Sequence, residues 1–396
     1  MPKQLSIAVI GGGIGGLTAA LSLAKLGHDV HVYEQARAIG AIGAGIQISP
    51  NASKILYRLG LAEAMAHSGV TPLWRHQRRW DDGRTLSRGP VGPQAEARYG
   101  APSYNFHRAD LIDILVGALP ADRLHVGHSL EALHDDGKQV EARFANGATS
   151  VSDLVIGADG IHSTVRRLVL GPDAPTFTGC VAYRGLVDAA KVESLGLPIE
   201  AELWMGPGQH AVHYFISAGR QIYVSCIIEQ DVWRGESWTD KGDVQKVLAS
   251  YSGWHPQVRT LIGALDEMFI WAIFDRAPLE RWSVGRVALL GDSCHAMLPT
   301  MAQGAAQAIE DGAALAACLA DIGLDRLSEA LVRYQDNRLP RATRLQGMSR
   351  QNKINFHLPD GAAQQERDQR MSSGGTDWAA GSLDWLFSHD ASVIKA

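Results

Sequence analysis

Three glycines near the N-terminus, Gly11, Gly13 and Gly16, have the spacing of a turn that binds the phosphates of a dinucleotide. They follow a short apolar run, Leu5–Ile10, and precede a helical pattern, so the chain is expected to pass from a buried strand into a helix. Gly11 permits the tight turn, Gly13 lets the backbone approach the phosphates, and Gly16 lets the helix pack close to the strand. The N–H groups left bare at the start of that helix can then bind a diphosphate.

An acidic residue, Glu34, ends the next alternating segment, Val30–Glu34, about 20 residues after Gly13. A carboxylate at this position accepts hydrogen bonds from a ribose whose 2′-hydroxyl is free. A phosphate at the 2′ position would be repelled by Glu34. The sequence therefore predicts that the bound dinucleotide is FAD or NAD, and not NADP.

Two aspartates, Asp159 and Asp292, also follow a buried strand and a glycine. Ser163 is expected to cap a helix that begins near Thr164, shortly after the first of them. Asp292 can reach a sugar or ribityl hydroxyl. The helix that opens at Gly304 can direct its positive N-terminus towards a flavin ring and stabilise negative charge on the reduced form.

Strand and helix patterns alternate on both sides of a middle region that is rich in short β patterns and aromatic residues. This arrangement predicts the α/β class, with a nucleotide-binding domain that is interrupted by a β-rich second domain. The turns described above would then lie in separated segments of one composite domain.

Two helices and a loop are predicted near the N-terminus. The first helix is expected over residues 18–26, closed by Gly27, and the second over residues 52–59, with Asn51 as its N-cap. The stretch 41–51 between them is too rich in glycine for a regular element, so an irregular loop is expected there.

Hairpins and long helices are predicted further along the chain. Asn146 and Gly147 mark a tight turn between two alternating segments. Residues 212–217 and 221–228 are expected to form paired strands about Gly219. The remaining predictions are long helices over 304–319 and 327–351, and a polar, loop-like tail from residue 359 until an apolar segment at 383–387.

Composition excludes several classes of function. The net charge of −5, without a basic block, argues against a nucleic-acid partner. A mean hydropathy of −0.07 and the lack of any apolar run of about 18 residues argue against a membrane span. No signal-peptide pattern precedes the first strand, so a cytoplasmic location is expected. The four cysteines are far apart, and we expect them to be reduced and buried, with no metal site: Cys180, Cys226, Cys294 and Cys318.

The three turn motifs together, in this order and separation, resemble the single-component (class A) FAD-dependent aromatic hydroxylases, the family typified by para-hydroxybenzoate hydroxylase. The resemblance spans about residues 5–350, and Arg108 matches an arginine that this family places near the flavin. The loop 43–52 and the run 301–305 are most similar to the branch of salicylate hydroxylase and 6-hydroxynicotinate 3-monooxygenase.

The resemblance implies a Rossmann-like FAD domain of the glutathione-reductase type, an inserted β-sheet substrate domain and C-terminal helices. The implied FAD domain consists of residues 1–71, 99–175 and 284–358, the substrate domain of residues 72–98 and 176–283, and the C-terminal tail of residues 359–396. The implied FAD-binding residues are Gly11, Gly13, Gly15, Gly16, Glu34, Gln35, Gly45, Arg108, Asp159, Asp292, Pro299, Gly304 and Ala305.

The activity that the resemblance implies is a monooxygenase reaction in two stages. NADH or NADPH, bound transiently, reduces the FAD, and O2 then forms a flavin C(4a)-hydroperoxide that transfers one oxygen atom. The implied substrate is a small phenolic or hydroxylated N-heteroaromatic compound, expected to be a carboxylate, and decarboxylative hydroxylation is one option. The donor, the substrate and a homodimeric state all stay open at this point.

The implied catalytic residues are Gln47, His210, Tyr214 and Thr300. His210 and Tyr214 match a histidine and a tyrosine of the 6-hydroxynicotinate branch, but Gln47 and Thr300 stand where members of these branches carry histidine. This difference predicts a different substrate. Gln47 can donate and accept hydrogen bonds, so it could orient a ring hydroxyl or a carboxylate.

Other side chains have two open interpretations. His213 and Tyr214 are neighbours on a predicted strand and point to opposite faces, so one of them can face the ring. Arg184 could pair with a substrate carboxylate or form a salt bridge between domains. For His295 a structural role is favoured, as a hydrogen-bonding partner of the backbone near the turn.

Two alternative functions have different signatures. A flavin-dependent reductase or epoxidase acting on a non-aromatic substrate would predict an apolar tail or a membrane-facing helix, and neither is evident in the sequence. A non-catalytic flavin-binding redox sensor would predict lost glycine–acid motifs or a reactive cysteine pair beside the flavin. The intact motifs and scattered cysteines favour the hydroxylase.

Overall fold

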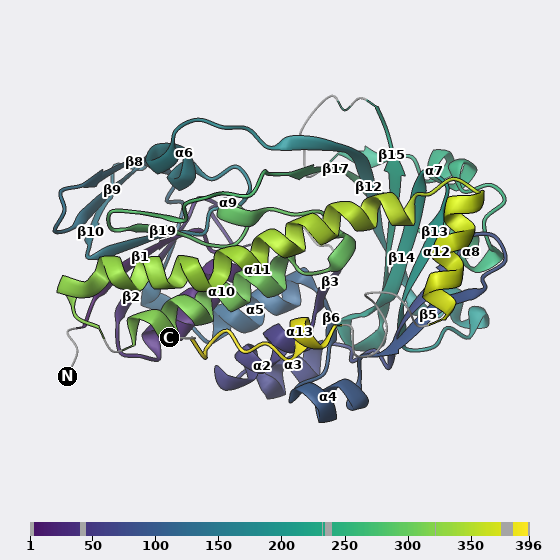
Figure 1. Ribbon diagram of the computed structural model, residues 1–396, viewed down its shortest axis with the longest axis horizontal. Helices are drawn as coiled ribbons and strands as arrows, with labels where there is room; N and C mark the ends of the chain where they lie inside the picture. Colours follow the sequence, from purple (N-terminus) through teal and green to yellow (C-terminus); the bar gives the residue numbers. More distant parts are fainter. Residues whose placement is uncertain are drawn as a thin grey trace.

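The computed structural model describes residues 4–39, 45–231, 233, 240–320, 322–373 and 383–394. Two large sheets lie at opposite ends of the molecule, and the long helix α11 (Leu327–Phe356) runs from one to the other (Figure 1). Residues 40–44 of the predicted loop, and Trp378 in the predicted tail, lie outside the described ranges. The mixed α/β class predicted from the sequence is confirmed.

The first sheet has six strands and contains the N-terminal strand. All of its neighbouring pairs are parallel except the one at the β18 edge. Helices α1 (Ile14–Ala24), α5 (Arg108–Gly117) and α10 (Gly304–Leu319) contribute to the same hydrophobic core as this sheet. The strand order is β18 (Ser283–Val284), β19 (Val287–Leu289), β11 (Leu154–Gly157), β1 (Ser6–Ile10), β2 (Asp29–Glu34) and β7 (Leu124–Val126).

The second sheet has eight strands, and its neighbouring pairs are antiparallel except for β13 and β4. One face packs on α7 (Val244–Ser250) and α8 (Pro256–Gly263) through a core that includes Trp204 and Tyr251. The strand order is β16 (Lys241–Gly242), β17 (Met268–Asp275), β12 (Thr176–Asp188), β15 (Gln221–Glu229), β14 (Gln209–Ile216), β13 (Glu200–Gly206), β4 (Trp74–Arg79) and β5 (Thr85–Pro90).

The remaining elements surround these sheets. Two smaller sheets are formed by β3 (Gly45–Ile48) with β6 (Tyr104–His107), and by β8 (Leu130–Asp135), β9 (Val140–Phe144) and β10 (Thr149–Ser152). The other α-helices are α2 (Pro50–Arg58), α3 (Ala62–Ser68), α4 (Pro93–Tyr99), α6 (Thr164–Leu170), α9 (Asp292–His295), α12 (Ala362–Ser372) and α13 (Asp384–Phe387). Short 3-10 helices cover 121–123, 189–195, 217–219, 299–301 and 324–326.

Several local predictions are confirmed. The turn at Asn146 and Gly147 joins β9 to β10, and β14 pairs with β15 in antiparallel register. Helix α10 has the predicted bounds, and α11 begins at the predicted residue but continues to Phe356. All four cysteines are buried and free.

The predicted first residues of two helices near the N-terminus are wrong. Helix α1 begins at Ile14 rather than at residue 18, because the turn glycines lead directly into it. Helix α2 begins at Pro50 with Ser49 as its N-cap, so Asn51 is not the cap. The Asn51 side chain points inward instead, where its amide donates to Glu310 (2.6 Å).

Two segments that were expected to be irregular are regular. Residues 45–48 form β3, because β6 offers them a partner strand that lies far away in the sequence. Residues 362–372 form α12, which packs against β5 and places Met371 in a small apolar cluster with Phe356. The limits predicted for the two domains and the tail stay a prediction.

None of the described helices combines the length and the apolar character needed to cross a membrane.

Candidate active site

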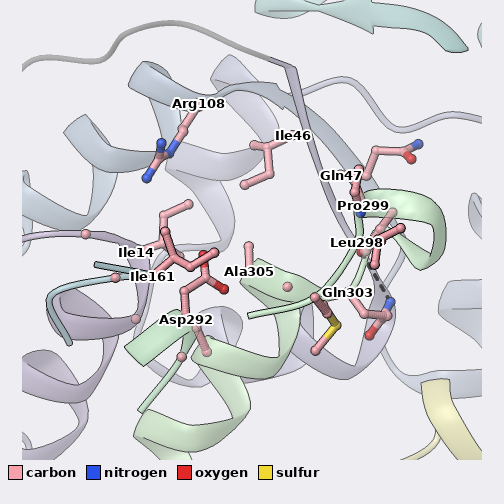
Figure 2. Close-up of a pocket in the computed structure, with 18 of the residues that line it drawn as sticks. Ile14, Ile46, Gln47, Arg108, Ile161, Asp292, Leu298, Pro299, Gln303 and Ala305 are labelled. Atoms are coloured by element: carbon pink, nitrogen blue, oxygen red, sulfur yellow. Dashed lines mark hydrogen bonds between the residues drawn. The ribbon is translucent and has the colours of Figure 1, made fainter. Parts of the chain in front are cut away.

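A cavity of about 690 Å³ extends from the glycine turn of β1 to one face of the eight-stranded sheet. Figure 2 shows Ile14, Arg108, Ile161 and Asp292 on one side of this cavity, with Gln47, Pro299 and Gln303 on the other. The cavity lining includes every predicted site residue except Gly16, which lies beneath the turn. Segments from both large sheets therefore contribute to one site.

The glycine turn fits the phosphates of a dinucleotide. A Cβ on Gly11, whose φ is +110°, would collide with the backbone of Ala158, and a Cβ on Gly16 would collide with the carbonyl of Gly11. A Cβ on Gly13 would meet no atom within 4 Å, so the space over this residue is open. The predicted roles of the three glycines agree with this arrangement: two permit close backbone packing, and one leaves room for a ligand.

Glu34 closes the cavity beyond the glycine turn. One carboxylate oxygen accepts from the Gly12 N–H (2.7 Å), and the other accepts from the Ala36 N–H (2.8 Å). These bonds fix the carboxylate beside the turn. Gln35 and the rings of Tyr33 and His128 line the same end of the cavity.

Asp159 is committed to the start of α6. Its carboxylate accepts from the Ser163 hydroxyl (2.5 Å) and from the Val165 N–H (3.0 Å), while the Ser163 oxygen accepts from the Arg166 N–H (2.9 Å). The predicted cap at Ser163 is confirmed. Burial raises the pKa of Asp159, although these hydrogen bonds oppose the effect. The geometry indicates that Asp159 shapes the turn rather than reaching freely into the cavity.

Asp292 and Arg108 contribute opposite charges to the cavity lining. The Asp292 side chain is exposed to the cavity at the start of α9, and the Arg108 side chain enters from α5 (Figure 2). Burial lowers the pKa of Arg108, and the negative charge of Asp292 opposes this effect. Hydroxyl and carbonyl groups of a flavin chain would find an acceptor and a donor here.

A buried ion network holds the start of α10 against the cavity. Arg338 on α11 donates to Glu310 (2.5 Å) and Asp311 (2.7 Å), and all three side chains are at most 1% exposed. Asp311 in turn accepts from the Gly291 N–H (2.8 Å) and contacts His295 Nε2 (2.6 Å). His295 therefore contacts a carboxylate, whereas the sequence favoured a backbone contact. The network ties the Asp292 turn to α10.

Buried amides connect this network to Ser49, the residue that follows β3. Gln303 donates to the Ser49 hydroxyl (2.9 Å), and Asn51 donates to Gln303 (3.2 Å). Gln303, Gly304 and Ala305 line the cavity. The contacts of Gln303 with Ser49 and Asn51 therefore hold the start of α10 at the cavity wall.

The floor of the cavity is one face of the eight-stranded sheet. The pairing register aligns its side chains in rows that cross the strands. One row contains Gln77, Leu203, Val212, Ser225 and Arg184; a second contains Arg75, Ala201, Tyr214 and Tyr223; a third contains Met205, His210, Ile227 and Ala182. In the first row, Leu203 and Val212 thus form an apolar surface between Gln77 at one end and Ser225 and Arg184 at the other.

Tyr214, and not His213, faces the cavity. The two tyrosines Tyr214 and Tyr223 lie with ring centroids 5.1 Å apart, close to Gly45, and burial raises the pKa of Tyr214 well above its usual range. His213 lies on the other side of the sheet, where its Nε2 contacts the Trp204 indole N–H (3.2 Å) and Glu202 (3.3 Å).

His210 belongs to a chain of titratable side chains that leads out of the cavity. Its Nδ1 lies 2.6 Å from Nε2 of His357, whose Nδ1 lies 2.9 Å from a Glu229 oxygen. Burial, with a smaller contribution from His357, lowers the pKa of His210 well below its usual value. His210 is therefore neutral at neutral pH, and the half-exposed Glu229 carboxylate connects the pair to solvent.

The other two predicted catalytic side chains, Gln47 and Thr300, differ in which hydrogen-bonding atoms remain available to a ligand. Gln47 Nε2 donates to Asn105 (3.2 Å), which leaves its amide oxygen available at the cavity wall. The Thr300 hydroxyl donates to the Ser349 carbonyl of α11 (2.6 Å), so its hydrogen is already in use. Thr300 lines the cavity but also joins the 299–301 turn to α11.

Sequence reasoning missed two cavity residues on β4, Arg75 and Gln77. The segment WRHQRR was assigned only to the substrate domain, although its alternation places residues 75 and 77 on one face of a strand. Arg184 lies over the Trp271 ring, 4.6 Å from its centroid, and its Nε is buried without a hydrogen-bond partner among the described residues. The described part of the chain gives Arg184 no salt bridge between the sheets.

Comparison with known proteins shows which protein family the chain belongs to. The model of the FAD-binding domain family matches residues 4–349. The chain is 40% identical to a 3-amino-4-hydroxybenzoate 2-monooxygenase of Streptomyces platensis, covering 98% of this chain and 97% of the relative. It is 39% identical to a 6-hydroxynicotinate 3-monooxygenase of Pseudomonas fluorescens, covering 89% and 92%.

The fold has a solved counterpart in a salicylate hydroxylase substrate complex, which superposes with a TM-score of 0.84 at 27% identity and covers 99% of both chains. The chain therefore belongs to the FAD-binding family of flavoprotein aromatic hydroxylases. Its class of activity is that of a flavin-dependent aromatic monooxygenase, and its cofactor is FAD.

Proposed function

We propose that this protein uses NAD(P)H and O2 to hydroxylate a small phenolic carboxylate. The observation that carries the proposal is a cavity in which a dinucleotide-binding turn meets a sheet face bearing Tyr214, His210 and Arg184. Such a cavity can hold a flavin at one end and an aromatic ring at the other.

The residues around the glycine turn would hold the FAD. Gly13 and the N-terminus of α1 would bind the diphosphate, Glu34 the adenosine ribose, and Asp292 with Arg108 the chain that leads to the flavin ring. The N-terminus of α10 would face that ring and stabilise negative charge on it. When bound, FAD supplies the electron transfer from NAD(P)H and the activation of O2.

The centre of the sheet floor would support the substrate ring. Leu203 and Val212 offer an apolar surface, and the tyrosine pair borders it on one side. Exclusion of water from this region would prevent side reactions with water and strengthen polar contacts to the substrate.

His210 would accept the proton of the substrate hydroxyl and thereby favour its electron-rich, phenolate-like form. The lowered pKa of His210 keeps it unprotonated but also makes it a weaker base, so an accepted proton must be passed on rather than held. The contacts to His357 and then to Glu229 provide a path by which that proton could leave for solvent. Gln47 would orient the ring through its free amide oxygen.

Arg184 would pair with the substrate carboxylate. Its Nε is buried and lacks a hydrogen-bond partner among the described residues, and a charged acceptor gives such a donor its strongest hydrogen bond. The compounds in the names of the two relatives, an aminohydroxybenzoate and a hydroxynicotinate, each have a ring hydroxyl and a carboxylate. This shared chemistry supports a phenolic acid as substrate.

A substrate panel tests the proposal. Salicylate, 3-hydroxybenzoate, 4-hydroxybenzoate, 3-amino-4-hydroxybenzoate and 6-hydroxynicotinate would each be incubated with the FAD-loaded protein and with NADH or NADPH. Both the consumption of NAD(P)H and the hydroxylated product are measured, because an unproductive ligand can stimulate oxidation without being hydroxylated. Mass spectrometry of the product shows whether the carboxylate is lost. The proposal is wrong if no phenolic acid yields a hydroxylated product.

A further inference from the structure

Gln77 is a buried amide in the cavity lining whose polar atoms have no hydrogen-bond partner among the described residues. Its side chain is 1% exposed, and neither Oε1 nor Nε2 forms a hydrogen bond to the described residues. An amide that loses water without gaining a partner destabilises the folded protein. A buried group of this kind is expected to have a partner, and the described residues do not supply one.

The position of Gln77 indicates where that partner would lie. Gln77 is in the central row of the sheet floor, next to Leu203 on β13 and therefore beside the apolar surface proposed for the substrate ring. The final torsion of a glutamine side chain is broad, so the amide can turn towards a ligand without leaving this place. A ring bound over Leu203 would put its substituents within reach of the amide.

We propose that Gln77 is a specificity-determining residue that recognises a hydrogen-bond donor and an acceptor on neighbouring ring carbons of the substrate. The inference rests on the proposed function and narrows its substrate class to phenolic acids with an ortho amino or ortho hydroxyl group. A glutamine amide presents an acceptor and a donor side by side, which suits two-point binding of adjacent donor and acceptor groups.

Arg75 adds a positive charge to the same side of the cavity. It lies two residues before Gln77 on β4, and both side chains line the cavity. Burial lowers the pKa of Arg75 to about 10, so the guanidinium remains charged at neutral pH. A nearby cation favours an ionised acceptor, so the phenolate form of an ortho-substituted phenol suits this side better than a neutral ether.

The test compares two substrates that differ in the proposed group. 3-Amino-4-hydroxybenzoate has the adjacent donor and acceptor, and 4-hydroxybenzoate lacks the amino group. The Kd of each would be measured on the FAD-loaded protein from the change in flavin absorbance, and kcat/KM from the hydroxylated product. Wild-type protein is expected to bind the first compound at least about 10-fold more tightly, as a paired buried hydrogen bond is worth about that factor.

Gln77→Leu should weaken binding of 3-amino-4-hydroxybenzoate by roughly 10- to 100-fold and change the Kd of 4-hydroxybenzoate less than about threefold. Gln77→Met provides a second apolar replacement with a flexible shape, and thermal unfolding checks that both variants fold. Gln94→Leu, at an exposed position of α4, is the matched control and should change neither Kd.

Three outcomes would overturn the inference: an unchanged preference in both Gln77 variants, an equal loss of affinity for both compounds, or no preference in the wild type. The first would leave the amide paired with ordered water, and the second would indicate a general packing role. Failure of the proposed function is a separate result, since it requires that no phenolic acid be hydroxylated. The Kd comparison measures the contribution of Gln77 to binding and does not depend on turnover.

Discussion

Arg338→Met should destabilise the protein through the buried ion network that supports the start of α10. Arg338 is 1% exposed, and its guanidinium contacts Glu310 and Asp311, which are fully buried. Removing one partner of a buried ion pair leaves an uncompensated charge and costs about 3–5 kcal/mol. Methionine fills most of the aliphatic volume, so the loss reports mainly on charge.

That free energy converts into a measurable shift. An unfolding entropy of about 2.1 cal/mol/K per residue gives roughly 0.8 kcal/mol/K for the 396-residue chain. The expected decrease in Tm is therefore about 4–6 °C. It would be measured on the FAD-loaded protein by circular dichroism and by the rise in flavin fluorescence as FAD is released. Arg326→Met is the control, because Arg326 and Glu329 are exposed and such a pair contributes at most about 1 kcal/mol.

The same network predicts a pH dependence. Burial opposes ionisation of Glu310 and Asp311. The attraction of Arg338 and Arg341 for Glu310, and of His295 and Arg338 for Asp311, prevails and lowers both pKa values to about 2. A depressed pKa contributes stability above the unfolded-state value, about 4, and this stability is lost as the pH falls towards 2. The deficit of Arg338→Met should therefore be largest at neutral pH and shrink below about pH 4. Equal Tm values for Arg338→Met and wild type at pH 7, or an equal decrease in the control, would refute this reasoning.

Three further predictions concern the cavity. Asp292→Ala should raise the Kd for FAD by roughly 10- to 100-fold, because a charged acceptor is lost, and fluorescence titration of the apoprotein would measure it; an unchanged Kd contradicts the role. Gln47→Ala should lower kcat/KM by about 10-fold with FAD affinity unaltered, as expected for the loss of one orienting hydrogen bond, so unchanged binding and hydroxylation would count against it. His357→Leu should lower kcat by about 10-fold or more and leave KM nearly constant. Since His357 adds to the lowering of the His210 pKa, its removal should raise that pKa and move the acidic limb of the kcat profile to higher pH; a displacement to lower pH is the opposing result.

The glycine turn at one end of the cavity could be predicted well because its determinants are local in the chain. A strand, three glycines and a helix follow one another within a few residues, so the spacing alone reports the backbone geometry. The cap at Ser163 and the bounds of α10 were predicted correctly for the same reason. Each depends on side chains and backbone groups that lie within a turn or two of one another.

Predictions failed where a partner far away in the sequence decided the outcome. β3 forms because β6 pairs with it, although Gly45 at its start disfavours a strand. Asn51 has the residue type of a helix cap, but buried contacts with Gln303 and Glu310 use its amide elsewhere. α12 forms from a polar segment because it packs against β5.

The sequence by itself determined the class of cofactor, since close approach of backbone to phosphate demands glycine at fixed spacing whatever surrounds the turn. Tertiary structure decided which side chains of the large sheet line the cavity. Tyr214, His210, Arg184 and Gln77 lie on three strands of one sheet, and their common face follows from strand order and register. Strand order and register are set by hydrophobic packing over the whole sheet, which no local pattern in the chain records.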